Sequence, residues 1–167
     1  IGIPLSTGSS VLLIPNYLMM MKLHLTNHWY TLPLLYTAYN LPLVIWMLIS
    51  GVRGLPYEIE EAARIDGCSQ FYIITRIIPP VIRPSFAAAA LFAFIGAWNE
   101  FITATVMVNG YALKNIQMAI YDYIGFFGQE WGPLCGAATL AIIPILLVFT
   151  FLGKQLVSGL TAGAVKG

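Results

Sequence analysis

Charge is the first thing that this sequence lacks. Only 9% of its 167 residues are Asp, Glu, Lys or Arg, whereas 59% are hydrophobic. Soluble domains carry about 25% charged residues, so the composition excludes an ordinary soluble domain and indicates contact with membrane lipid. The formal net charge of +1 points to no acidic partner, and we expect no nucleic-acid binding.

The chain also lacks the residue sets of common catalytic sites. A phosphate-binding loop needs Gly, four residues and then Gly-Lys-Ser/Thr, but the only Gly-Lys pair, Gly153-Lys154, is followed by Gln155. No Ser/His/Asp or Cys/His set is evident. We therefore expect no catalytic residues and no cofactor bound by this chain.

Histidine and cysteine are equally sparse. His24 and His28 stand four residues apart and could share a helical face, but no third ligand lies near them in sequence, so we expect no metal site. Cys68 falls in a charged loop and Cys135 in a predicted membrane span, so we do not expect them to form a disulfide with each other. Both are expected to act as plain small residues.

What the sequence does contain is long apolar runs. Tyr30–Val52 and Trp131–Gly153 have no charged residue, and Pro84–Gly110 has only Glu100. A helix of about 20 apolar residues crosses the hydrocarbon core of a bilayer. The predicted spans are residues 30–52, 84–109 and 132–153.

The first 25 residues are apolar but interrupted. Pro4, the polar run Ser6–Ser10 and Pro15 divide them into pieces too short to span a membrane. We expect residues 1–25 to hold the end of a missing span, followed by an interfacial helix from about Ser10 to Leu25. The chain is accordingly expected to be the C-terminal part of a longer protein.

Lysine and arginine are distributed unevenly around the predicted spans. Six of the eight lie in residues 53–83 or 154–167, and only Lys22 and Lys114 fall on the opposite side. Short cytoplasmic loops are enriched in these residues. The 53–83 loop and the C-terminal tail 154–167 are therefore predicted to be cytoplasmic.

Residues 110–131 are predicted to lie at the outer surface, among aromatic residues typical of a membrane interface. Four residues at helical spacing predict a short surface helix here: Ile116, Ala119, Ile120 and Tyr123. This segment fits a plain connector as well as it fits a docking surface for a partner.

The 53–83 loop concentrates the charge that the rest of the chain lacks. Its stretch "EEAARIDG", residues 60–67, holds three acids and one arginine. Pro56 suits the first turn of a helix, and the acids at its start favour the helix dipole. A narrow face of mostly small residues repeats at i, i+3, i+4 and i+7: Ile59, Ala62, Ala63 and Asp66. Gly67 is expected to end the helix, and the residues offer a close-packing, charged surface to another protein.

A second helix is expected after this glycine. Ser69 is its predicted N-cap, and the helix carries Phe71, Ile74, Ile77 and Ile78. Pro79-Pro80 is expected to break it, because proline lacks the backbone donor that an interior helical position needs.

This loop resembles the EAA motif of permease subunits of binding-protein-dependent ABC importers. The family pattern is Glu-Ala-Ala, three residues, Gly, nine residues, Ile, one residue and Leu-Pro. Every spacing fits, and one position departs, since Pro79 stands where the family has Leu. The segments "YTAYNLPLVIWML", "FAFIGAWNEF" and "GLTAGAVKG" resemble the sugar-importer branch, similar to maltose permeases. The residues assigned to ATPase coupling by this resemblance are Glu60, Glu61, Ala62, Ala63, Arg64, Asp66, Gly67, Ile77 and Pro80.

The resemblance implies an all-α polytopic membrane protein, a partial permease bundle of the type I ABC importers, with the EAA loop as a cytoplasmic coupling helix. It also implies a location in the plasma or inner membrane of a bacterium or archaeon. It implies as partners a second permease subunit, a dimer of ATP-binding-cassette ATPases that holds the ATP and Mg²⁺, and an extracytoplasmic solute-binding protein. A carbohydrate is the expected solute. An importer of another solute, such as an amino acid or phosphate, and a non-transport membrane scaffold are the alternatives.

Within the spans, Glu100 is the outlier. An acid at mid-membrane costs roughly 2.5–3.5 kcal/mol on insertion scales, and intramembrane acids usually face a cavity. With Trp98 and Asn99 it could line the solute path, to which Asn40 and Trp46 are weaker additions. An interfacial acid that reaches headgroups or another subunit is an equally good interpretation.

Overall fold

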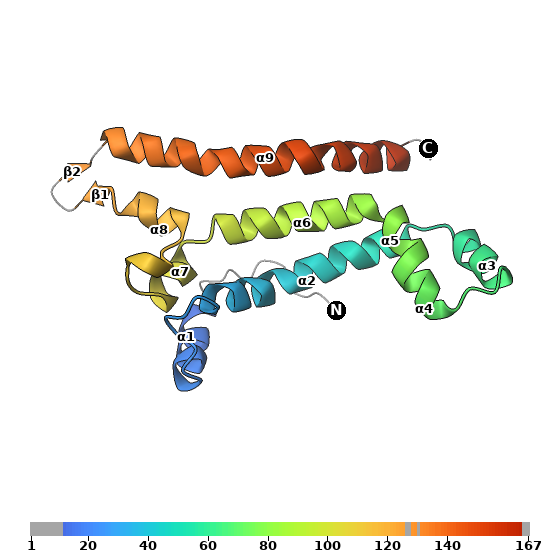
Figure 1. The fold of residues 1–167 in the computed structure, drawn as a ribbon, viewed down its shortest axis with the longest axis horizontal. Coiled ribbons are helices and arrows are strands. Elements are labelled where there is room, and N and C mark those ends of the chain that lie inside the picture. The colour runs from blue at the N-terminus through green and yellow to red at the C-terminus, as the bar shows by residue number, and fades with distance from the viewer. Residues whose placement is uncertain (1–11, 126–127, 130, 165–167) are drawn as a thin grey trace. The chain divides into compact units, whose positions relative to one another are not determined.

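The computed structural model describes residues 12–125, 128–129 and 131–164, and it is helical almost throughout this part (Figure 1). In chain order the elements are α1 (Leu13–Lys22), α2 (Thr31–Arg53), α3 (Tyr57–Ile65), α4 (Gln70–Tyr72), the π-helix η1 (Ile73–Ile77), α5 (Ile78–Val81), α6 (Arg83–Trp98), α7 (Ile102–Met107), the 3₁₀-helix η2 (Tyr111–Leu113), α8 (Ile116–Tyr121), β1 (Ile124–Gly125), β2 (Gly128–Gln129) and α9 (Trp131–Ala164). The predicted all-α fold is confirmed, and the two-residue antiparallel pair β1–β2 is a minor departure from it.

Contacts divide the chain into two units. The first consists of residues 1–42 and 93–147, and the second of residues 43–92 and 148–167. The long helices α2, α6 and α9 each contribute to both units.

Two helices are long and apolar enough to cross a membrane, namely α2 and residues Trp131–Gly153 of α9. A third candidate span arises only if Gln70–Val81 and Arg83–Trp98, which are bent by 75°, are taken together. The prediction of one span over 84–109 therefore differs from the structure, because α6 ends at Trp98 and a new helix, α7, begins at Ile102.

The first unit has a compact apolar core. Its buried residues come from α1, α2, α7, the residue after α7, and α8: Met20, Leu32, Leu35, Ala104, Met107, Val108 and Met118. Two hydrogen bonds connect the loop after α1 to the end of α7. The Asn27 backbone N–H donates to the Met107 carbonyl at 3.0 Å, and the Asn27 side-chain Oδ1 accepts from the Asn109 backbone N–H at 2.8 Å. These bonds fix where α2 begins relative to the core.

Two of the expected surface elements are shorter than predicted. Helix α1 covers only part of the expected 10–25 helix, while residues 1–11 lie outside the described part of the chain. In the outer segment α8 ends at Tyr121, so Tyr123 does not belong to the predicted helical face. His24 lies beyond α1 with a φ of 55°, and therefore it does not share a helical face with His28.

In the second unit α2 and α6 approach closely. A side-chain Cβ at Gly51 would lie 2.6 Å from the Cβ of Ser85, which is too close for any real contact. Glycine is therefore required where these two helices cross. Helix α9 continues through the predicted tail as far as Ala164.

Candidate functional site

Helix α3 carries the charged EAA segment and has favourable charges at both ends. Pro56 precedes it in an extended conformation, Glu58 and Glu60 stand in its first turn, and Arg64 stands in its last turn. Acids near a helix N-terminus and bases near its C-terminus are each stabilised by the helix dipole. Arg64 also donates to Glu60 Oε1 at 2.6 Å. This pair is exposed and adds only about 0.3–0.5 kcal/mol.

The C-terminus of α3 is closed by a Schellman motif. Gly67 has a φ of 78°, its N–H donates to the Arg64 carbonyl, and the Cys68 N–H donates to the Ala63 carbonyl, both at 3.0 Å. This left-handed conformation favours glycine. The prediction that Gly67 ends the helix is confirmed. Glycine suits this position because it has no Cβ to disfavour the positive φ.

The buried face of α3 is narrower than predicted. Ala63 is buried and Ile59 is half-buried, whereas Ala62 and Asp66 are exposed. Only the i and i+4 positions of the expected face turn inward. Of the predicted coupling residues, Glu61, Ala62, Arg64, Asp66 and Gly67 thus lie on the exposed side.

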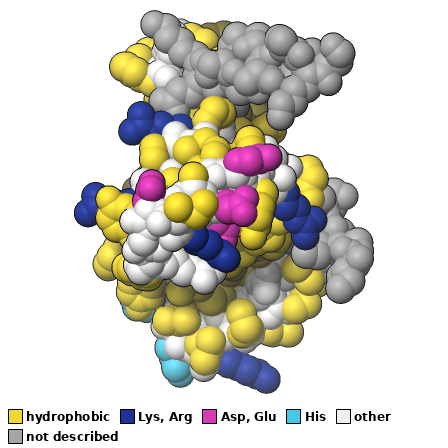
Figure 2. All heavy atoms as spheres, turned by 90° about the vertical axis from the view of Figure 1, so that its right-hand side faces the viewer, with side chains coloured by type: hydrophobic (Ala, Val, Ile, Leu, Met, Phe, Trp, Pro, Cys, Tyr) yellow, Lys and Arg dark blue, Asp and Glu magenta, His cyan; other side chains and the backbone are white. Residues whose placement is uncertain are grey.

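Large apolar side chains stand exposed beside these charges. Ile65 is 81% exposed on α3, and Phe71 is 77% exposed on α4. Figure 2 shows this face of the molecule, where acidic and basic side chains are interspersed with hydrophobic ones. A mixed surface of this kind is suited to contact with another protein.

Ser69 begins the next helix as predicted, since its Oγ accepts from the Tyr72 N–H at 3.3 Å. The expected break at Pro79-Pro80 is wrong, because both prolines lie inside the helical residues of α5. A π-turn precedes them, and the Ile78 N–H donates five residues back to Ile73. The wider turn accommodates two residues that lack a backbone N–H, and it avoids the clash between a proline ring and the carbonyl of the preceding turn in an ordinary α-helix. The chain changes direction only after Val81.

The apolar face of this second helix also differs from the expected one. Ile73 is buried, whereas Phe71 and Ile74 point outward. The motif residue Ile77 is half-buried and Pro80 is exposed. The π-turn shifts the helical phase, and simple i, i+3 spacing could not predict this.

Glu100, in the first unit, lies in a polar cluster between α6 and α7. Its carboxylate accepts from the backbone N–H groups of Thr103 and Ala104 at 2.9 and 3.2 Å, and from the Tyr36 hydroxyl at 3.4 Å. The first N–H groups of a helix have no partner within it. Glu100 therefore caps α7, which explains why the predicted continuous span is interrupted here.

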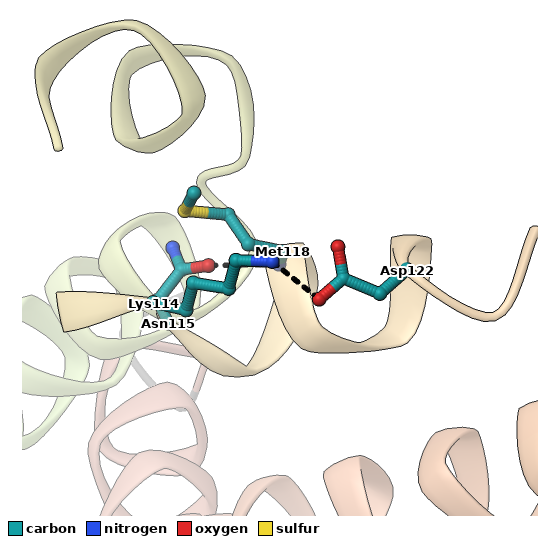
Figure 3. Close-up of polar contacts among 4 residues, drawn as sticks. All are labelled: Lys114, Asn115, Met118 and Asp122. Carbon is teal, nitrogen blue, oxygen red and sulfur yellow. Dashed lines mark hydrogen bonds and ion pairs between the residues drawn. The ribbon is translucent and has the colours of Figure 1, made fainter. Parts of the chain in front are cut away.

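Asn115 joins this cluster from the start of α8. Its side-chain Nδ2 donates to the Glu100 carbonyl at 2.7 Å, while Oδ1 accepts from the Met118 N–H and caps α8, as Figure 3 shows. The same figure shows the ion pair between Lys114 and Asp122. Tyr36 and Asn115 were not predicted from the sequence, although Asn115 precedes an apolar helical repeat in the manner of an N-cap.

Four of the five residues predicted for the solute path belong to this unit, and Trp46 belongs to the other. Trp98 donates to the Ala141 carbonyl at 3.2 Å, while the amides of Asn40 and Asn99 donate to carbonyls of their own helices. A Cβ at Gly96 would lie 2.8 Å from Asn40 Oδ1. The structure thus brings Asn40 to α6 at Gly96, and Glu100 is engaged within its own chain.

No group of three or more metal-ligating side chains is present among the described residues. His28 is engaged locally, with its Nδ1 2.7 Å from the Thr26 carbonyl.

Comparison with known families decides the class of the protein. Residues 5–161 match the family described as the inner membrane component of binding-protein-dependent transport systems. The chain belongs to this family. Its members are transport components of the membrane, which agrees with the two span-length apolar helices and confirms the predicted resemblance to ABC importer permeases.

Several relatives of this permease chain are named as transporters of sugars or sugar derivatives. It is 35% identical over 156 residues to a sulfoquinovosyl glycerol transport system permease of Agrobacterium fabrum, which covers 93% of this chain and 55% of the relative. It is 35% identical over 157 residues to a diacetylchitobiose uptake permease of Streptomyces coelicolor, covering 94% and 57%. It is 37% identical over 147 residues to a trehalose/maltose permease of Thermococcus litoralis, covering 87% and 53%. The permease chain spans little more than half the length of these three relatives.

Proposed function

We propose that the protein is a permease subunit of an ATP-driven importer and forms half of a path for a carbohydrate delivered by an external binding protein. The observation that carries this proposal is α3. It is an EAA segment folded as a short helix, closed by a Schellman turn, with charged and apolar side chains exposed together. The family membership and the sugar permeases among the relatives support the solute class.

In this proposal α3 docks on a separate ATPase subunit. Glu61, Arg64 and Asp66 supply polar contacts. The exposed Ala62 and Gly67 have a small side chain or none, which allows the ATPase subunit to approach the helix closely. A short helix fixed at both ends moves as a rigid body, so closure of an ATPase dimer can be passed to the apolar helices. ATP and Mg²⁺ belong to that partner, and a second permease subunit completes the path.

The proposed orientation places α3 and the C-terminal tail in the cytoplasm, as the distribution of Lys and Arg indicates. Glu100 then lies toward the outer side, where its carboxylate positions α7 beside Trp98 and Asn99 at the solute path.

Glu61→Lys in the full-length protein tests the coupling role. Because Glu61 is exposed and has no ion pair among the described residues, its replacement should leave the subunit folded. We expect co-purification of the ATPase and ATP-driven uptake of the solute to fall at least tenfold, since reversing a charge in an interface costs several kcal/mol.

Ala112→Lys is the control, because it introduces a positive charge at an exposed position of η2, in the predicted outer segment. It should leave ATPase co-purification unchanged. Normal ATPase binding and uptake in Glu61→Lys would refute the coupling role.

A further inference from the structure

A groove in the second unit holds two arginines, Arg76 and Arg83, to which the transport proposal gives no role. It is open to the surface and has a volume of about 700 Å³. The elements around it are η1, α5, α6 and the part of α9 near residue 152. The lining residues that matter here are Arg76, Arg83, Phe86, Ala87, Ala90 and Leu152.

The charges at the groove are of one sign. Arg76 and Arg83 are both exposed, and no acid is among the lining residues. In the described part of the chain the only ion pairs are Arg64–Glu60 and Lys114–Asp122, so neither groove arginine is neutralised there. Two like charges around one hollow repel each other, and an anion between them would be stabilised by both.

The groove changes from cationic to apolar along α6. Arg83, Ala87 and Ala90 stand at i, i+4 and i+7 and therefore lie on one face of the helix. At a rise of 1.5 Å per residue, Ala90 lies about 10 Å along the helix from Arg83. Phe86 and Leu152 add to this apolar part of the lining, which suits an extended hydrocarbon chain.

We propose that this groove binds one anionic phospholipid, with its phosphate between Arg76 and Arg83 and an acyl chain along Ala87 and Ala90. A soluble phosphate would use only the cationic end, whereas a lipid also occupies the apolar end. Basic pockets between helices at the membrane surface bind anionic headgroups, and α6 is an apolar helix of a membrane permease. The bound lipid would brace the 75° bend between Gln70–Val81 and α6.

Native mass spectrometry of the full-length protein, in the complex with which it is purified, tests this proposal. Dioleoyl phosphatidylglycerol and dioleoyl phosphatidylcholine serve as probes. We expect tighter retention of phosphatidylglycerol, with Arg83→Gln weakening it about fivefold and Arg76→Gln combined with Arg83→Gln about 30-fold. Replacement of both arginines by lysine keeps the charges and should preserve the preference.

Arg53→Gln is the matched control, because it removes an exposed arginine at the end of α2 that does not line this groove. It should change retention by less than twofold. Equal retention of the two lipids, or an unchanged preference in the double glutamine variant, would overturn the proposal. So would full displacement of the lipid by inorganic phosphate, or cross-linking of a benzophenone residue at position 86 to a partner protein in place of lipid.

Discussion

Glu100 shows how one acidic side chain is accommodated within a long apolar segment of the chain. Its carboxylate receives two backbone N–H groups of α7 and the Tyr36 hydroxyl. Hydrogen bonds to a charged group are about twice as strong as neutral ones, so these partners offset much of the cost of removing the acid from water. The acid thereby fixes the turn between α6 and α7 against α2.

Glu100→Ala should lower the stability of the full-length subunit by about 1–3 kcal/mol, because it leaves the first N–H groups of α7 without their acceptor. The measurement is thermal unfolding of the detergent-solubilised subunit. Asn99→Ala is the control, since the Asn99 side chain is exposed and bonds only to the Ile95 carbonyl of its own helix. Equal melting temperatures for the two variants would show that Glu100 does not hold this turn.

At the scale of the element, α3 depends on the charges of its first turn and on its closed C-terminal turn rather than on its length. It has nine residues, and isolated helices of this length are marginal in water. The Schellman turn at Gly67 satisfies carbonyls at the C-terminus, and the acids of the first turn interact favourably with the helix dipole. A helix that relies on its ends should fray when either end is changed.

Gly67→Ala should fray the C-terminus of α3, because a Cβ in the left-handed region costs about 1–2 kcal/mol. Space is not the cause, since nothing lies within 4 Å of a Cβ at this position. We expect faster tryptic cleavage after Arg64 in membranes whose cytoplasmic face is accessible. Gly54→Ala serves as control, because its Cβ would make only ordinary contacts at 3.6 Å. Unchanged cleavage in Gly67→Ala would mean that the turn is not needed for the helix.

The sequence predicted those elements whose signal is local. The absence of charge marked α2 and the first part of α9, and the acids with Gly67 marked α3. The turn after Trp98 was not predicted, because it depends on where Glu100 finds its hydrogen-bond donors. The position of Pro79-Pro80 inside a helix was also missed, since a π-turn leaves no pattern in residue spacing.

At the scale of the molecule, the polar cluster around Glu100 could be recognised only once the fold was known. Tyr36, Glu100 and Asn115 are separated by up to 79 residues along the chain, and only packing of the first unit brings them together. The EAA segment needed no such packing to be found, because its spacing is a local property. The EAA helix was thus predictable from the sequence, whereas the polar network around Glu100 was not.

The central claim is that α3 faces the cytoplasm, where an ATPase can bind it. The most direct test is labelling of Arg64→Cys with a membrane-impermeant maleimide, in a full-length subunit that also carries Cys68→Ser and Cys135→Ser. Tyr111→Cys, at an 89% exposed position in the predicted outer segment, is the reference for the opposite side. We predict labelling of Arg64→Cys only in inside-out vesicles and of Tyr111→Cys in intact cells; labelling of Arg64→Cys in intact cells would contradict the account.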